Sequence, residues 1–115
     1  MREVIKAMKA LSDDTRLRIL NIVAERDCCV CEVMQALNIS QTRASRNLRI
    51  LEEAGFLNSR REGLWMHYSL RTDKENFSLP LVKIVTDFAR KNAIYRQDQK
   101  RLKKVESNQC GEIHS

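Results

Sequence analysis

Hydrophobic residues recur at intervals of three and four through the first half of the chain, which is the spacing of one helix face. Four such stretches can be traced: Val4, Ile5, Met8 and Leu11; Leu17, Leu20, Val23 and Ala24; Val33, Met34 and Leu37; Ala44, Leu48 and Leu51. The pattern therefore predicts four amphipathic helices, near residues 4–11, 15–25, 31–37 and 41–54.

The connections between these helices are short and carry capping residues. Ser12, followed by Asp13 and Asp14, supplies a cap and favourable acidic charge for the helix that begins near residue 15. Asn38-Ile39-Ser40 is short enough for a tight turn, and Ser40 then caps the next helix. A three-residue turn is thus predicted to join the helices at 31–37 and 41–54.

A change of period follows Gly55, a residue suited to the end of a helix. Residues 58–61 and 64–70 flank Glu62-Gly63 and predict a β-hairpin with its tip at these two residues. In the second strand one face receives Leu64, Met66, Tyr68 and Leu70, and the other receives Trp65, His67 and Ser69. The chain is therefore predicted to be mainly helical with one small hairpin.

The last apolar pattern predicts one long helix over residues 79–104, with Pro80 in its first turn. Its seam contains Leu81, Ile84, Val85, Phe88, Asn92 and Tyr95. This seam and the first helix are predicted to form a two-fold dimer interface. The alternative, a helix folded back on its own core, stays open. Residues 105–115 are predicted to form a flexible polar tail, which leaves 1–104 as the folded domain.

Length and charge narrow the class of protein. A chain of 115 residues is the size of one domain, and its net charge of +6 suggests an anionic partner. Between residues 41 and 71 six arginines stand against three glutamates, and arginine binds phosphate and guanine bidentately. No apolar run approaches the length of a membrane span, so we expect a cytoplasmic protein without a membrane partner.

The arginines fall where a DNA-binding protein would use them. On the helix at 41–54, Thr42, Ser45, Arg46 and Arg49 share the polar side, opposite the apolar stripe. Two short helices joined by a tight turn, followed by a hairpin that carries Arg60 and Arg61, predict a winged helix-turn-helix. Double-stranded DNA is the predicted partner.

Three segments, "ALSDDTRLRIL", "SQTRASRNLRILEEAGFL" and "RREGLWMHYSL", resemble the arsenic- and metal-responsive repressors of the ArsR/SmtB family over about residues 4–100. The resemblance implies a homodimer through the first and last helices, with the fourth helix in the major groove and the hairpin against the DNA backbone or minor groove. The family's recognition segment falls on Ser40, Gln41, Ala44, Ser45, Asn47, Leu48, Leu51 and Gly55. Asn47 stands where the family usually has His. The predicted DNA contacts are Gln41, Thr42, Ser45, Arg46, Asn47, Arg49, Arg60 and Arg61.

The segment "DCCVCEV" gathers Cys28, Cys29 and Cys31, three of the four cysteines in the chain. In a reducing cytosol such a cluster is more often a ligand set or a reactive site than a structural bridge. No second C-x-x-C or H-x3-H pattern supports a structural zinc finger. The only histidines, His67 and His114, give no paired base for a catalytic thiol, so we expect no enzyme activity. A soft-ligand site, a dithiol redox switch and inert buried thiols stay open.

Geometry limits how these thiols can cooperate. On a regular helix the side chains of Cys29 and Cys31 would point about 200° apart and could not share a ligand. A common ligand therefore requires that the helix begin after them or unwind its first turn. A helix N-terminus nearby would be expected to help ionise the thiols.

The family resemblance implies a specific ligand. Its sensor motif E-L-C-V-C-D-L places two cysteines on Cys29 and Cys31, which implies trivalent arsenic (arsenite, or antimonite) as the inducer, with no cofactor required for DNA binding. The motif's third cysteine falls on Met34, so Cys28 is the expected third thiolate and Cys110 the second choice. Residues 79–104 hold no His, so the family's site for zinc, nickel or cobalt is absent. A thiol-redox-responsive or a cadmium- or lead-responsive repressor is the alternative.

Overall fold

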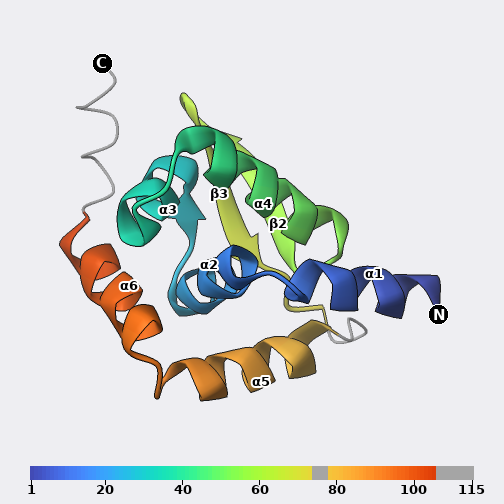
Figure 1. Ribbon diagram of the computed structural model, residues 1–115. Helices are drawn as coiled ribbons and strands as arrows, with labels where there is room; N and C mark the ends of the chain where they lie inside the picture. The colour runs from blue at the N-terminus through green and yellow to red at the C-terminus, as the bar shows by residue number, and fades with distance from the viewer. Residues whose placement is uncertain (74–77, 106–115) are drawn as a thin grey trace.

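The computed structural model describes residues 1–73 and 78–105. The elements run in the order α1 (Arg2–Leu11), α2 (Asp14–Glu25), β1 (Cys28–Cys29), α3 (Val30–Leu37), α4 (Gln41–Glu53), β2 (Leu57–Glu62), β3 (Trp65–Leu70), α5 (Ser78–Ala89) and α6 (Ala93–Lys104) (Figure 1). The predicted class, mainly helical with a small hairpin, is confirmed. The predicted tail, with Cys110 and His114, lies outside the described residues except for Val105.

Local side-chain caps set the boundaries of the first helices. Asp13 is the N-cap of α2, and its carboxylate accepts the backbone N–H of Arg16 at 3.1 Å. Ser40 caps α4 in the same way, accepting from the Arg43 N–H at 3.2 Å. Asn38 ends α3 in the left-handed region with φ 57°, so the chain turns sharply between α3 and α4.

The sheet has three antiparallel strands in the order β1-β3-β2, one more strand than the sequence predicted. Glu62 pairs with Trp65, so the hairpin tip is Gly63-Leu64 and not Glu62-Gly63. Gly63 has φ 62°, which suits a residue without Cβ in this turn. Because Leu64 lies in the turn it is 80% exposed, and its predicted place in the second strand beside Met66 is wrong.

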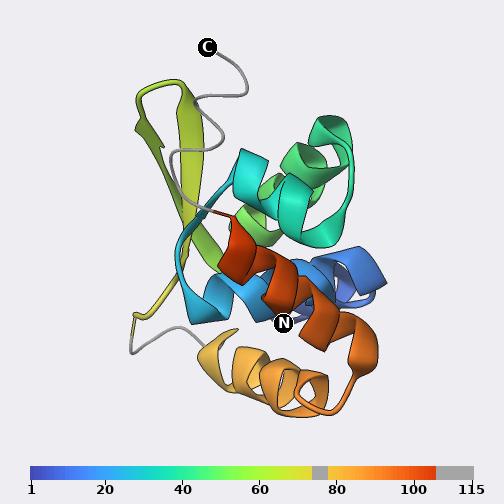
Figure 2. The ribbon, with the colours of Figure 1, turned by 90° about the vertical axis from the view of Figure 1, so that its left-hand side faces the viewer.

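The hydrophobic core lies around α2, with the remaining helices and the sheet packed about it (Figures 1 and 2). Ile19, Leu20 and Ile22 of α2 are fully buried, as are Leu48 and Leu51 of α4. The apolar stripe predicted for α4 is therefore buried at the centre of the domain, whereas the stripe predicted for α2 is buried at Leu20 and Val23 and only partly at Leu17 and Ala24. Helix α1 buries only Ala7 and Ala10, and its first turns project from the body of the domain (Figure 1).

The predicted single helix over 79–104 is wrong, because the chain bends at residues 90–92. Asn92 caps a second helix, its side-chain oxygen accepting from the N–H groups of Ile94 at 2.9 Å and Tyr95 at 3.4 Å. The bend allows α6 to fold back against α2 and α3, where a straight helix would have left the domain (Figure 2). Folding back on the core, the alternative considered above, therefore describes α6, which packs against α2 and α3, while α5 packs against α2 and buries Val82 there.

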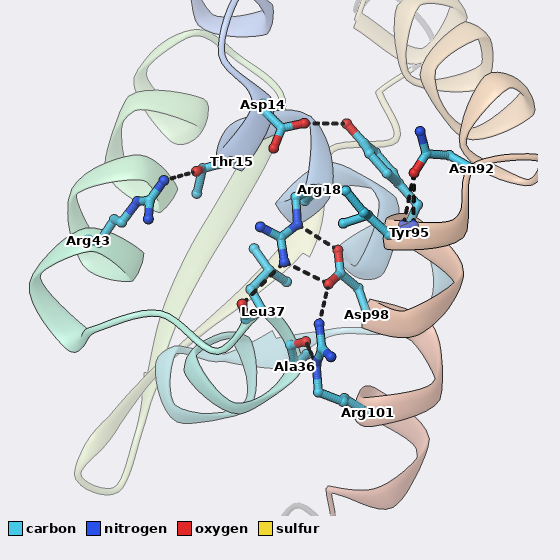
Figure 3. Close-up of polar contacts among 11 residues, drawn as sticks. Asp14, Thr15, Arg18, Ala36, Leu37, Arg43, Asn92, Tyr95, Asp98 and Arg101 are labelled. Carbon is cyan, nitrogen blue, oxygen red and sulfur yellow. Dashed lines mark hydrogen bonds and ion pairs between the residues drawn. The ribbon is translucent and has the colours of Figure 1, made fainter.

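A buried ion cluster holds α6 in that position. Asp98 is fully buried, and its carboxylate accepts from Arg18 Nε and Nη2, both at 2.8 Å, and from Arg101 Nη2 at 2.9 Å (Figure 3). The two arginines also reach α3: Arg18 Nη2 donates to the Leu37 carbonyl at 3.2 Å, and Arg101 Nε donates to the Ala36 carbonyl at 2.7 Å. The last carbonyls of a helix lack partners within it, so these bonds complete the end of α3.

No helix in the described part of the chain has both the length and the apolar character needed to cross a membrane.

We predict that Asp98→Asn destabilises the fold by about 3–5 kcal/mol, because it leaves two arginines without their buried counter-charge. Urea unfolding at matched protein concentration measures the change. Asp87→Asn, at an exposed position on α5, is the matched control and should change the free energy of unfolding by less than about 0.5 kcal/mol. An equally small effect of Asp98→Asn would contradict the role assigned to the cluster.

Candidate DNA-reading and ligand-sensing sites

The outward side of α4 carries most of the residues predicted to contact DNA. Gln41, Thr42, Ser45, Arg46 and Arg49 line one shallow groove along this helix. Its apolar side, with Ala44, Leu48 and Leu51, is buried against the core. Hydroxyl and guanidinium groups are thus presented together on a rigid element, which is the arrangement that groove reading requires. The DNA contacts themselves stay a prediction.

Asn47 is a correction to the predicted set. It is only 5% exposed and lies on the inward side of α4. Its side-chain oxygen accepts from Arg16 Nη1 at 3.0 Å, and its amide donates to the Arg43 carbonyl at 2.9 Å. Position 47 follows Arg46 by 100° around the helix, which turns it towards α2 and away from solvent. Asn47 therefore positions α4 and does not offer a surface for DNA.

Two arginine bonds fix the reading helix to α2. Arg43 Nη2 donates to the Thr15 hydroxyl at 2.7 Å (Figure 3). Arg16, besides its bond to Asn47, donates from Nε to the Ala10 carbonyl at 2.6 Å. These bonds fix α4 to the start of α2. Within the "DDTR" stretch, Thr15 and Arg16 therefore serve to position α4.

The two hairpin arginines differ in their surroundings. Arg60 is held by carboxylates, with Nε 2.7 Å from Glu62 Oε1 and Nη1 3.4 Å from Asp27 Oδ2. The side chain of Arg61 is exposed and makes no hydrogen bond or ion pair with another described residue. Since Arg60 is already neutralised by two acids, Arg61 is the better candidate for a phosphate contact.

The cysteine segment spans the change from strand to helix. Cys29 is the last residue of β1 and the N-cap of α3, in an extended conformation with φ −84° and ψ 166°. Cys31 is the second residue of α3. The helix therefore begins between the two cysteines, which removes the 200° separation expected on a continuous helix. Both side chains are buried together under Trp65 of β3.

Cys28 does not belong to this group. Successive residues of a strand point to opposite faces, so Cys28 faces the main core while Cys29 faces Trp65. The Cys28 thiol donates to the Arg26 carbonyl at 3.3 Å and is fully buried. In this structure Cys28 therefore lies on the other side of the strand from Cys29, and it would have to leave the core to become the third thiolate. Cys110, the second choice, lies outside the described residues.

Glu32 completes the cap of α3 beside Cys29. The Cys29 sulfur accepts the Glu32 N–H, and Glu32 Oε1 accepts the Cys29 N–H at 2.8 Å, which is a capping box. Glu32 is only 2% exposed, and its other oxygen lies 2.9 Å from Arg26 Nη2 as an ion pair without hydrogen-bond alignment. The sequence signal for this role was present: C-x-x-E reproduces the spacing of an S/T-x-x-E capping box.

The surroundings suppress ionisation of the free thiols, contrary to the expectation from the helix N-terminus. Burial raises the pKa of Cys29 to about 11, outweighing the backbone N–H groups that favour its thiolate. Burial, and next the charge of Glu32, raise the pKa of Cys28 to about 12. Both side chains are therefore neutral thiols at physiological pH and lose their protons only when a ligand replaces them.

The start of α3 holds two sulfurs that fit the chemistry of a soft ligand. The sulfurs of Cys29 and Cys31 lie at one buried place, which suits a thiophilic centre. Cys29 is a thiol, whereas Cys31 is disulfide-bonded in the structure and becomes a donor only after reduction. Within residues 1–73 and 78–105 no three His, Cys, Asp or Glu side chains are already arranged to hold a metal ion. Two sulfur positions therefore fit, and a third donor requires movement.

We predict that alkylation of Cys29 by iodoacetamide reaches its half-maximal rate near pH 11, because its pKa is raised to about 11 and only the thiolate reacts. Mass spectrometry of quenched samples gives the pH profile. The urea-unfolded chain is the control and should show the ordinary midpoint, near pH 8.5. A midpoint near pH 8.5 in the folded protein would contradict the neutral, buried state of this thiol.

Comparison with known proteins agrees with this geometry. The pattern that defines the bacterial regulatory proteins of the arsR family matches residues 13–59, which run from the cap of α2 into β2. The chain is 41% identical over 91 residues to the arsenic resistance transcriptional regulator ArsR1 of Pseudomonas putida KT2440. That match covers 76% of this chain and 71% of the relative.

Solved structures with the same architecture include two at 28% identity. One is the homodimeric winged helix-turn-helix DNA-binding domain of Mb0332 from Mycobacterium bovis, with a TM-score of 0.67 over 80% of this chain and 82% of that one. The other is AntR, an antimony-specific transcriptional repressor, with a TM-score of 0.60 over 75% and 72%. The predicted fold and family are confirmed: the chain belongs to the arsR family of bacterial regulatory proteins, and it is a winged helix-turn-helix transcription regulator and not an enzyme.

Proposed function

We propose that the protein is a cytoplasmic transcriptional repressor that binds operator DNA as a homodimer and leaves it when trivalent arsenic or antimony binds Cys29 and Cys31. One observation carries the proposal: the two cysteines share a buried place at the start of α3, the helix that leads through a three-residue turn into the reading helix α4. A ligand that bonds to both sulfurs acts directly on the helix-turn-helix.

Soft sulfur donors favour a thiophilic centre over hard cations. Cys31 is disulfide-bonded in the structure, so the step begins with reduction of that disulfide by a cytosolic thiol. In the reduced protein, trivalent arsenic forms one covalent bond to each of the two sulfurs and keeps a hydroxide as its third substituent. Each bond replaces an arsenic–oxygen bond, and the thiol proton leaves with that oxygen as water. Neutral thiols are therefore adequate reactants, which accords with the raised pKa of Cys29. The arsenic-resistance role named for the relative in Pseudomonas putida and the antimony specificity named for AntR support this ligand class.

The dimer is proposed to form through α1 and α5. Val4, Ile5 and Met8 of α1 are exposed, as are Ile84 and Phe88 of α5, the latter by 78%. Exposed apolar residues of this size mark an association surface. A two-fold dimer would place two copies of α4 in successive major grooves of a palindromic operator.

The switch is proposed to work through the cap of α3. The Cys29 sulfur accepts the Glu32 N–H, so a bond to arsenic withdraws that acceptor and loosens the first turn of the helix. Helix α3 is also tied to α6 by Arg101 and to α2 by Arg18. A coupling free energy of about 1–3 kcal/mol between ligand and DNA would suffice for a useful response.

We predict that Cys29→Ser and Cys31→Ser each abolish release of operator DNA by arsenite while leaving DNA affinity nearly unchanged. Gel-shift titration of the reduced protein with arsenite measures release, and Cys28→Ala, which faces the core, is the control that should still respond. Arsenite release by either serine variant would refute the site.

Parallel titrations with cadmium, lead and peroxide separate the alternatives. Peroxide release that a thiol reductant reverses, without any arsenite response, would identify a redox switch. Release by cadmium or lead alone would identify a metal-responsive repressor. Either result would replace arsenic as the inducer.

We predict that Arg61→Ala weakens DNA binding about equally for operator and unrelated sequences and lowers the salt dependence by about one phosphate contact. Fluorescence anisotropy over a range of salt concentrations measures both quantities. Arg60→Ala is the comparison and should have a smaller effect, because Glu62 and Asp27 already neutralise that side chain. Unchanged affinity in Arg61→Ala would refute the wing assignment.

A further inference from the structure

A polar cleft opens where α5 and α6 both pack against α2 (Figure 2). Its volume of about 320 Å³ lies at the lower end of the range of about 300–1,000 Å³ that small-molecule sites occupy. All of its lining residues belong to these three helices or to the turn between α5 and α6. The reading face of α4 and the cysteine segment therefore lie outside the cleft.

The buried wall of the cleft contains an amide without a partner. Asn21 of α2 is only 7% exposed, and its side chain makes no hydrogen bond with any other residue in 1–73 or 78–105. Its backbone carbonyl accepts from Gln99 Nε2 at 3.1 Å, while the side-chain oxygen of Gln99 has no partner among the described residues. A buried amide is unfavourable unless something bonds to it. Asn21 and Gln99 therefore offer hydrogen bonds to a molecule in the cleft.

Charged side chains of both signs line the cleft without neutralising one another. The guanidinium groups of Arg90 and Arg96 and the carboxylate of Glu25 make no ion pair or hydrogen bond with any described residue. Elsewhere in the described chain arginines pair with acids, as Arg18 and Arg60 do. Two cations and one anion are thus available to a ligand in one small space.

The cleft faces away from the proposed dimer surface. Thr86 of α5 lines it, and this residue lies two positions from both Ile84 and Phe88, the exposed apolar residues assigned to the dimer. Two positions correspond to about 200° around a helix. A dimer formed through Ile84 and Phe88 therefore leaves the cleft open to solvent.

We propose that this cleft binds a small zwitterion of the amino-acid class. The ligand carboxylate binds the guanidinium groups of Arg90 and Arg96, which match a carboxylate in geometry as well as in charge. The ligand ammonium group donates to Glu25 and to the side-chain oxygen of Gln99. A simple anion would be repelled by Glu25, and a simple cation by the two arginines. The site uses no cysteine, so the inference is independent of the proposed function.

Isothermal titration calorimetry of the reduced full chain, with each of the common L-amino acids in turn, tests the proposal. At least one should bind, with one molecule per chain. Its analogues that lack either the ammonium group or the carboxylate should bind about tenfold more weakly or less, because a hydrogen bond to a charged group contributes that much. Failure of every amino acid to bind, or equal affinity for either analogue, would overturn the proposal.

Variants that remove one charge test the location of the ligand. Arg96→Gln and Glu25→Gln, both at exposed positions, should each weaken binding of the same amino acid about tenfold or more. Lys100→Gln and Glu53→Gln remove the same charges at exposed positions outside the cleft and are matched controls that should bind as wild type does. Unchanged affinity in either Arg96→Gln or Glu25→Gln would overturn the assignment to this cleft.

Discussion

The buried carboxylate of Asp98, neutralised by Arg18 and Arg101, determines how the last helix meets the rest of the domain. Its two partners continue to the carbonyls of Ala36 and Leu37, so one acid on α6 fixes α2 and the end of α3 together. A buried charge of this kind tolerates little rearrangement, because a lost partner leaves an uncompensated ion. The end of α3 that precedes the turn into α4 is thereby held in one position.

The start of α3 is held by different means. The capping box of Cys29 and Glu32 is its first fixed point, and Arg26 ties it further to α6 by donating to the carbonyls of Leu102 and Val105 at 3.3 and 3.2 Å. Among these contacts, only the cap involves a sulfur, that of Cys29, to which a thiophilic ligand can bind. Under the proposed function, α3 is therefore held firmly at the end that leads into α4, and its other end, which carries the cysteines, can be released.

The sequence was sufficient to predict those helices whose buried residues recur at the helical spacing of three and four. The stripe of α4 and the cap at Ser40 are local features, so this helix could be predicted from neighbouring residues. The cap of α2 was placed one residue early, because Ser12 ends α1 and Asp13 is the N-cap of α2. The two-residue strand β1 is too short to show alternation, and its pairing with β3 depends on residues far along the chain. For that reason the facing of Cys28 and the pairing of Cys29 with His67 could not be predicted. The burial of Asn47 could not be predicted either, because its partner Arg16 lies far away in the sequence. No Gly or Pro marks the bend at Asn92 in the sequence, and Asn92 itself was assigned to the apolar seam of the predicted helix.

Amide hydrogen exchange of the reduced protein, with and without arsenite, tests most directly whether the thiols control the start of α3. The account predicts that arsenite accelerates exchange of the amides of Val30, Cys31 and Glu32, because the Cys29 sulfur no longer caps the helix. Exchange in the centre of α2, at Ile19 and Leu20, should stay unchanged. Arsenite bound at full occupancy with no change in exchange at the start of α3 would contradict the account.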